Sequence, residues 1–322
     1  MGTFGTRSKN SRLVFTAAGM LSISLLVGDS LAQTPPLCQQ VKYLLSNGNA
    51  HDVAGTTVDL NSDFMFVGRP TTNPMFTDPI SSVYIFKSGQ TPGSWIEYQV
   101  ILDPREDNTE SLFGQRLSVD EDSLIVTMVR EESPSGVIGA AAIFRLDVAT
   151  DTWILEQKLF PFNGSPSRSD VAIDGDFAII GQRHNNHGGV RAGAAFVFRF
   201  DGSSWNEEAE FFTIDRALDD LFGSSVAMFG NIVIVGAPQE DDLGVDSGSV
   251  HVYKRINGSW FDVGKINAPD GAAGDLFGGS VDYDGTTLAI GASGHESGGP
   301  NSGAVYLYRD NGLPGLEFIT KL

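Results

Sequence analysis

The sequence predicts an all-β protein built from five copies of one four-stranded antiparallel unit, and three observations support this prediction. A pattern of roughly 55 residues recurs from about residue 55 to residue 322, and each copy has an apolar anchor residue. The phrase LFG occurs at 112–114, 221–223 and 276–278, and the similar runs IVIVGAP and TLAIGAS follow at 232–238 and 287–293. No stretch of useful length has the apolar period of a helix. The anchors are Val58, Leu117, Val171, Val226 and Val281.

The last copy shows the four strands of the unit in order. The first strand is SVDY at 280–283, and the turn Asp284-Gly285 joins it to TLAIG at 287–291. A polar loop leads through residue 303 to AVYLY at 304–308, and LEFITKL at 316–322 is the fourth strand. Apolar, aromatic and β-branched residues fill the strands, while Gly, Asn and Asp fill the joints. Because such a sheet cannot bury both faces alone, we expect the copies to stack radially as the blades of a β-propeller.

The fourth strands begin with a large apolar residue at one shared position. These residues are Trp95, Trp153, Trp205, Trp260 and Leu316, so the position holds all four tryptophans of the chain. An indole ring can bury about 150–250 Å². We therefore interpret this column as core packing between blades rather than as a platform for a sugar.

The recurring phrases resemble the FG-GAP repeat, in its bacterial form, which also builds the propeller head of integrin α-subunits. Phe222-Gly223 followed by Gly236-Ala237-Pro238 spells the motif, and Phe113-Gly114 and Phe277-Gly278 repeat its first half. The resemblance implies a propeller over 55–322, with repeats at about 55–112, 113–168, 169–221, 222–276 and 277–322. It also implies a role in adhesion or recognition, although a fold alone does not determine a function.

Residues 1–54 precede the first repeat and contain two features. A basic start, the apolar run LVFTAAGMLSISLLV at 13–27 and small residues at 30–32 predict a signal peptide over 1–32. In the segment 33–54, residues 42–58 align without gaps to 265–281, which predicts one extra fourth-type strand at about Gln40–Leu45. Five repeats and one extra strand fit either a closed five-bladed ring or part of a larger ring.

Charge and cysteine content limit the classes of partner and compartment. The formal net charge of −19 disfavours nucleic acid and anionic lipid as partners. The single cysteine, Cys38, cannot form an internal disulfide. No later segment has the ~20 apolar residues of a spanning helix. We expect a protein without a membrane span that is secreted or held in a bacterial cell envelope.

The long connections between strands two and three and between strands four and one carry most of the clustered acid. We expect them to share one face, and binding residues commonly lie on such loops. Glu240, Asp241, Asp242 and Asp246 are the best candidates for binding a cation. The calcium loop of the FG-GAP family is not carried over, because the turns between strands one and two are too short to supply its oxygens. We expect no cofactor, and Ca²⁺ at the acidic loops stays open.

Candidate catalytic residues are few. No nucleophile elbow, zinc-protease motif or phosphate-binding loop occurs. His184 and His187 have a spacing that could bind a metal, but we interpret them as solvated polar residues of a loop. Asp59 and Asp282 occupy matching positions in the first strands of copies one and five, and two channel carboxylates are what a propeller glycoside hydrolase would use.

These observations favour a non-catalytic, exported binding module whose protein or glycan ligand contacts the acidic long-loop face. The alternatives are a propeller glycoside hydrolase and a purely structural protein of the cell envelope.

Overall fold

The structure is a computed structural model of the chain. It describes residues 45, 53–70, 81–91, 93–105, 112–133, 136–162, 169–187, 189–213, 218–296, 298–299, 302–312 and 316–322. The predicted signal peptide at 1–32 and most of the extra strand at about Gln40–Leu45 lie outside these residues, and only Leu45 of that strand is described. No helix of the described part is both long enough and apolar enough to cross a membrane.

The described chain forms five antiparallel sheets of four strands each, and every sheet is one blade. Blade 1 contains β1 (Val58–Leu60), β2 (Phe64–Arg69), β3 (Ser82–Ser88) and β4 (Trp95–Leu102). Blade 2 contains β5 (Leu117–Asp120), β6 (Ser123–Ser133), β7 (Gly136–Asp147) and β8 (Thr152–Leu159). Blade 3 contains β9 (Ser169–Asp174), β10 (Phe177–Gln182), β11 (Ala194–Phe200) and β12 (Trp205–Phe211). Blade 4 contains β13 (Ser225–Phe229), β14 (Ile232–Ala237), β15 (Ser249–Ile256) and β16 (Ser259–Ile266). Blade 5 contains β17 (Phe277–Tyr283), β18 (Thr287–Ala292), β19 (Ala304–Asp310) and β20 (Leu316–Lys321).

The predicted fold class is therefore confirmed, and each blade follows the order of the chain from its first to its fourth strand. The pairing of the third and fourth strands has a β-bulge at the same place in all five blades, for example between Val252 and Tyr253 in blade 4 and between Leu307 and Tyr308 in blade 5. A bulge increases the local twist of a strand. The outer strand of each blade is therefore turned relative to the inner strands in the same way.

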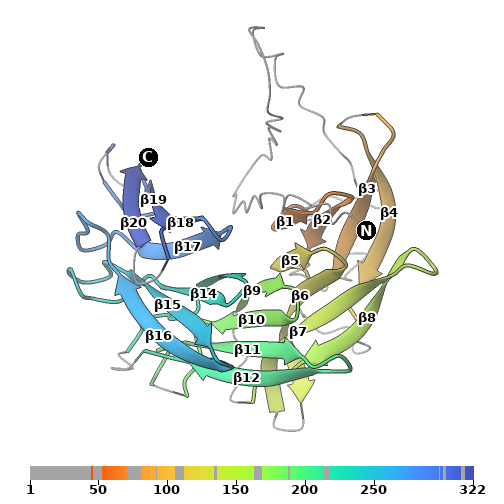
Figure 1. The fold of residues 1–322 in the computed structure, drawn as a ribbon, viewed down its shortest axis with the longest axis horizontal. Helices are drawn as coiled ribbons and strands as arrows, with labels where there is room; N and C mark the ends of the chain where they lie inside the picture. Colours follow the sequence, from red (N-terminus) through yellow and green to blue (C-terminus); the bar gives the residue numbers. More distant parts are fainter. Residues whose placement is uncertain are drawn as a thin grey trace, which may run out of the picture.

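The blades are arranged around a common centre, with their first strands innermost (Figure 1). Strands pack against each other across the boundaries between blades 1 and 2, 2 and 3, 3 and 4, and 4 and 5. Blades 1 and 5 do not share such a packed boundary among the described residues, and a gap separates β1–β4 from β17–β20 at the top of Figure 1. Of the two arrangements that the sequence left open, the described residues thus form an open arc rather than a closed five-bladed ring.

The core lies between the blades, not within one sheet. Each of four hydrophobic clusters joins two consecutive blades, and a fifth covers blade 1 on its other side, where Leu45 packs against it. The predicted packing between blades is confirmed for Trp153, Trp205 and Trp260, whereas Trp95 packs in the cluster on the other side of blade 1. Trp153 of blade 2 lies edge-on to Phe64 and Phe66 of blade 1, at ring-centroid distances of 5.6 and 5.0 Å. Trp260 of blade 4 makes the same kind of contact with Phe177 of blade 3 at 5.9 Å.

The glycines of the recurring phrases meet at the boundaries between blades. A Cβ atom on Gly236 in blade 4 would lie 2.0 Å from the carbonyl oxygen of Gly278 in blade 5. The same approach joins Gly68 to Gly114 and Gly181 to Gly223, at 2.0 and 2.4 Å. The second glycine of each pair has a positive φ angle, which favours glycine. The FG half of one repeat thus packs against the glycine of the second half of the preceding repeat.

Candidate binding surface on the long-loop face

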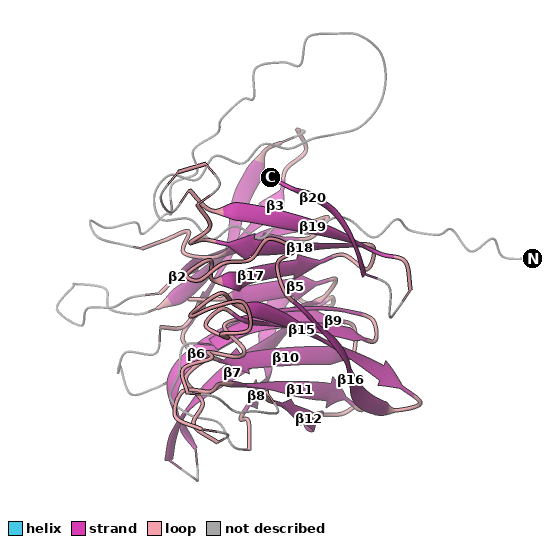
Figure 2. Cartoon of the chain, turned by 90° about the vertical axis from the view of Figure 1, so that its left-hand side faces the viewer, coloured by secondary structure: helices cyan, strands magenta, loops and turns pink. Residues whose placement is uncertain are grey.

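Three loops between second and third strands share one backbone hydrogen bond. They join β10 to β11, β14 to β15 and β18 to β19, at one end of blades 3, 4 and 5, whose strands are seen side-on in Figure 2. In each loop a glycine N–H donates to the carbonyl oxygen of a residue eight positions earlier: Gly193 to Asn185, Gly248 to Glu240 and Gly303 to His295. This hydrogen bond holds the two sides of each loop together.

One buried polar side chain stands at the same position in each of these loops, and in blade 4 it is Glu240. The Glu240 carboxylate accepts a hydrogen bond from the Ser249 hydroxyl, and both of its oxygens lie 3.1 Å from His251 Nε2. Lys265 Nζ lies 3.3 Å from Glu240 Oε2. Burial works against ionisation, but the hydrogen bonds from His251 and Ser249 and the charge of Lys265 prevail and lower the pKa of Glu240.

The other candidate cation ligands are divided between two smaller arrangements. Asp242 lies 2.5 Å from Lys265 Nζ and accepts a hydrogen bond from the Asn267 amide. Asp241 accepts the backbone N–H of Asp246 at 2.8 Å, and Asp246 accepts the Gln239 amide at 3.0 Å. In the part of the chain that the structure describes, no group of three or more His, Cys, Asp or Glu side chains could hold a metal ion. These carboxylates instead shape the loop.

The two histidines of the 182–194 loop have separate surroundings. His187 Nδ1 lies 2.9 Å from Glu210 Oε1, and the backbone N–H of His187 donates to Asn185. The hydrogen bond from Arg191 lowers the pKa of Asp219, and the nearby His184 acts in the same direction to a smaller extent. The structure does not bring the two imidazoles to one metal site among the described residues.

Exposed aliphatic side chains lie on two of these loops and on the connection between β12 and β13, and the sequence analysis missed them. They are Val190, Leu218, Leu243 and Val245, with exposed fractions of 63%, 66%, 45% and 67%. Hydrogen bonds between loops hold the backbone beside them: Asp219 N–H donates to Val190 O at 3.2 Å, and Gly274 N–H donates to Val245 O at 2.8 Å. Apolar residues inside loops rich in Gly and Asp were the available signal. We call these four residues with the neighbouring Asp219, Asp241 and Asp242 the loop patch.

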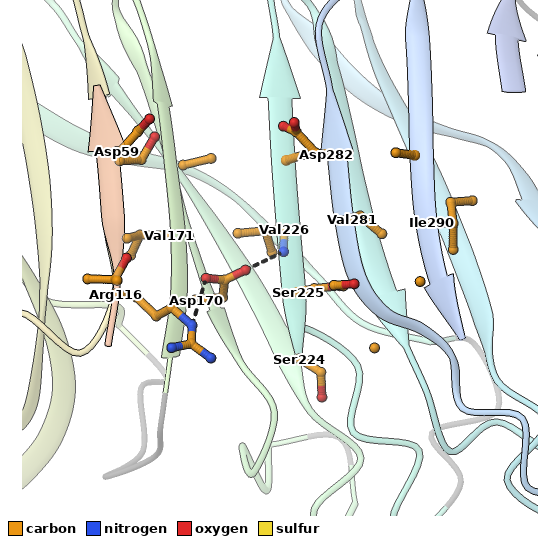
Figure 3. Close-up of a pocket in the computed structure, with 18 of the residues that line it drawn as sticks. Asp59, Arg116, Asp170, Val171, Ser224, Ser225, Val226, Val281, Asp282 and Ile290 are labelled. Carbon is orange, nitrogen blue, oxygen red and sulfur yellow. Dashed lines mark hydrogen bonds and ion pairs between the residues drawn. The ribbon is translucent and has the colours of Figure 1, made fainter. Parts of the chain in front are cut away.

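A cavity of about 230 Å³ lies at the centre of the arc and is lined mainly by the first strands (Figure 3). Asp59, Arg116, Asp170 and Asp282 are among its lining residues. Burial raises the pKa of Asp170, against the opposing charge of Arg116, whose Nε lies 3.6 Å away. The sequence analysis did not single out this ion pair.

The two carboxylates predicted for the glycosidase hypothesis both line this cavity, on opposite sides of it in Figure 3. Asp59 accepts the backbone N–H of Leu60 and, across the blade boundary, the N–H of Val119, each at 2.8 Å. Asp170 similarly accepts the N–H of Val226 in the next blade at 2.9 Å. Asp282 accepts the N–H of Tyr283 at 3.0 Å. Asp59 and Asp170 therefore connect neighbouring first strands, which is a structural role.

The model of the FG-GAP repeat matches residues 153–198, 205–253 and 260–308. The chain carries FG-GAP repeats. Each matched stretch begins at the tryptophan of one fourth strand and ends on the third strand of the next blade, so each FG-GAP match spans a blade boundary. A search of curated proteins by sequence gave no match.

Two solved structures are similar to this chain in fold. The periplasmic gluconolactonase of Pseudomonas aeruginosa aligns with a TM-score of 0.53 and 15% identity, over 81% of this chain and 69% of that chain. A hypothetical selenium-binding protein of Sulfolobus tokodaii aligns with a TM-score of 0.50 and 11% identity, over 81% of this chain and 64% of that chain. At these identities the likeness concerns the fold alone.

Proposed function

We propose that this protein is an exported, non-catalytic binding module that recognises a protein ligand through the loop patch. The observation that carries the proposal is the set of four exposed aliphatic side chains on hydrogen-bonded loops beside acidic residues. Exposed apolar groups with a polar surround are typical of interaction sites. Because the loops are already ordered by their own hydrogen bonds, little conformational entropy is lost on binding.

The chemistry of the patch favours a ligand that is both apolar and positively charged. Asp241 and Asp242 are exposed, and the whole chain is strongly acidic, with a formal net charge of −19. Such a surface attracts a basic partner electrostatically, and salt screens this attraction. A protein fits better than a glycan, because the exposed apolar side chains of the described loop patch are aliphatic rather than aromatic.

Catalysis at the central cavity is the alternative. The similar gluconolactonase structure and the cavity that Asp59 and Asp282 line support it, but both oxygens of Asp59 already accept backbone N–H groups. A carboxylate stabilised in this way is a poor general acid. We therefore propose a binding function before an enzymatic one.

The test uses a synthetic peptide of alternating Lys and Leu as the probe and polylysine as the charge-only control. We expect the peptide to bind the chain more tightly than polylysine does, and to bind more weakly as salt rises. The paired substitutions Leu218→Ser and Val245→Ser should weaken binding about tenfold or more, since each removes an exposed apolar contact. Val148→Ser is the matched control, because Val148 is an exposed valine in the turn between β7 and β8.

Equal binding of the peptide and polylysine, or equal loss in the loop variants and the Val148 control, would contradict the proposal. Hydrolysis of a lactone or glycoside that Asp282→Asn abolishes would support the enzymatic alternative instead.

A further inference from the structure

A groove lies between the outer strands of blades 3 and 4, and it belongs to none of the sites described above. It has a volume of about 370 Å³ and is lined by residues of β12, β15 and β16 and of the turn between β15 and β16. Ala209 of β12 and Trp260 of β16 are among them. No residue of the loop patch lines the groove, so a ligand bound there is independent of the function proposed above.

At the two preceding blade boundaries a glutamine side chain fills the corresponding place. Gln99 Oε1 accepts the backbone N–H of Trp153, and Gln99 Nε2 donates to the backbone oxygen of Trp153, both at 2.8 Å. Gln157 forms the same two hydrogen bonds with Trp205, again at 2.8 Å. Each glutamine therefore joins the fourth strand of its own blade to the tryptophan of the next blade.

Blade 3 has an alanine where blades 1 and 2 have these glutamines. Ala209 occupies the same place beside the bulge of its blade as Gln99 and Gln157 do in theirs. The methyl group of alanine is too short to reach the next strand, so the groove remains where the carboxamide would lie. The exposure of the tryptophans agrees with this difference, because Trp205 is buried whereas Trp260 is partly exposed.

The backbone N–H and C=O groups of Trp260 turn toward this groove. Trp260 pairs with Arg255, and the N–H of Arg255 donates to Asn231 on the opposite side at 2.8 Å. This is therefore a pair without mutual hydrogen bonds, in which the polar groups of Trp260 face outward. Those of Trp205 face Gln157 in the same way. Among the described residues, neither backbone group of Trp260 has a hydrogen-bond partner.

The other lining residues suit an amide on an apolar stem. The rings of Tyr253 and Phe211 stack with their centroids 4.0 Å apart, and both residues line the groove. They provide apolar surface against which methylene groups can pack. Glu210 and Asp262 also line the groove, and they favour a positive charge beside the amide.

We propose that the groove binds the side chain of a glutamine from a basic segment of a partner protein. This glutamine takes the place that Gln99 and Gln157 hold at the preceding boundaries. Its carboxamide oxygen accepts the N–H of Trp260, its amide nitrogen donates to the backbone oxygen of Trp260, and its methylene groups lie near the ring of Tyr253.

The boundary between blades 4 and 5 differs from this groove. Gly264 stands at the position of the glutamines, but the next fourth strand begins with Leu316 instead of a tryptophan. Val263 and Lys265 stand where the groove has two glutamates. We therefore place the glutamine site at the boundary between blades 3 and 4 alone.

The test follows the tryptophan backbone amides of the whole chain by heteronuclear NMR. Isotope labelling of tryptophan alone gives four backbone signals, because the chain has four tryptophans, and Trp260→Phe assigns the signal of Trp260. L-glutamine amide is the probe, and L-norleucine amide is the control, since it has the same ammonium group and terminal amide but no side-chain carboxamide. We expect the probe to shift the Trp260 signal saturably and to bind about tenfold more tightly than the control, because two hydrogen bonds distinguish them.

Ala209→Gln is the decisive variant, because it supplies the missing side chain from within the protein. It should leave the circular dichroism spectrum unchanged, abolish the response of Trp260 to L-glutamine amide, and slow hydrogen exchange of the Trp260 amide about tenfold. Gln157→Ala should have the opposite effect and make the Trp205 signal respond to the probe.

An unchanged Trp260 signal would mean that only water occupies the groove and would overturn the proposal. Equal responses to the two amides, or a response that persists in Ala209→Gln, would overturn it as well. The loop-patch substitutions Leu218→Ser and Val245→Ser should leave the response unchanged, so failure here is distinguishable from failure of the proposed function.

Discussion

Blades 4 and 5 have the same four-stranded sheet, the same bulge and the same backbone hydrogen bond in their long loops, yet their outer faces differ. Val250 of blade 4 is fully buried, whereas Val305 at the matching position of blade 5 is 40% exposed. The two valines occupy the same place in the pairing of their second and third strands. Burial in this protein is therefore a property of the boundary between two blades, as expected for a repeat protein whose units stabilise their neighbours. Matched substitutions in the two blades test this conclusion.

The largest difference in stability between matched variants of blades 4 and 5 is expected for Gly236 and Gly291. Gly236→Ala places a methyl group against the Gly278 carbonyl oxygen, so it should lower the free energy of unfolding by about 3 kcal/mol, at the upper end of the cost of overpacking. Gly291→Ala meets only the Ser280 side chain, which can rotate, and should cost less than about 1 kcal/mol. Denaturant unfolding of both variants measures the difference. Equal costs would show that the contact between Gly236 and Gly278 is not tight.

Substitution of the buried polar residues of the long loops should, in contrast, lower the free energy of unfolding by the same amount in both blades. Glu240 contacts His251 of β15, and His295 Nδ1 lies 3.0 Å from Asp275 Oδ2 in the connection before β17, so each fixes its loop to a neighbouring segment. Glu240→Ala and His295→Ala should each cost about 2 kcal/mol, because buried partners lose their hydrogen bonds. A much smaller cost for His295→Ala, measured in the same way, would mean that the whole of blade 5 is loosened and not its outer face alone.

Glu240 also gives a pH dependence. Its pKa is lowered from the ordinary value of 4.5 in the folded protein, so its ionised form contributes stability that is present above pH 4.5. That contribution is lost as the pH falls through the lower folded pKa. The difference in unfolding free energy between the wild type and Glu240→Gln should therefore shrink as the pH falls below 4.5. A difference that grows in acid would contradict the lowered pKa.

The stability costs of substituting the two valines should differ by less than the costs of substituting the two glycines. Val250→Ala removes fully buried methyl groups and leaves a cavity, which should cost about 2 kcal/mol. Val305→Ala should change stability by less than about 0.5 kcal/mol, as an exposed substitution does. Thermal unfolding monitored by circular dichroism can resolve the two. If Val305→Ala cost as much as Val250→Ala, the outer face of blade 5 would be covered in solution.

The smallest difference concerns the two serines of the first strands. Ser225→Ala removes the hydrogen bond to Gly278 and should cost about 1 kcal/mol, whereas Ser280→Ala should be nearly neutral. Hydrogen exchange of the backbone around Gly278 is a sensitive readout. We expect faster exchange there in Ser225→Ala and no change in the Ser280 variant.

Much of the fold was predictable because it follows from periodicity. The same spacing recurs for the anchors, the turns and the tryptophans. A strand that is ambiguous in one copy can therefore be assigned by its alignment with the other copies. The sequence left the closure of the ring open, because closure depends on contacts between the first and last copies and no repeat contains both. The described residues show an open arc.

The candidate site was less predictable, because the sequence does not show which way a loop side chain points. The run Glu240-Asp241-Asp242 reads as one acidic cluster, but Glu240 turns inward to His251 while Asp242 pairs with Lys265. Val190 and Val245 are isolated apolar residues in polar loops, and only their exposure marks them as candidates for binding. Asp59 departs from the repeat for a structural reason, its hydrogen bond to Val119.

The contact between Gly236 and Gly278 also bears on how such chains change in length. Repeat 4 carries one glycine for the boundary before it, Gly223, and one for the boundary after it, Gly236, so both halves of the contact are copied when that repeat is duplicated. Deleting repeat 4 would likewise bring Gly181 of repeat 3 against Gly278 of repeat 5, which is again a pair of glycines. Repeats 2 and 3 differ, because Thr127 occupies the second glycine position in repeat 2 and Arg168 occupies the first in repeat 3. A gene that encodes this chain can thus gain or lose one blade of about 55 residues at repeat 4 and keep the new junction sterically compatible.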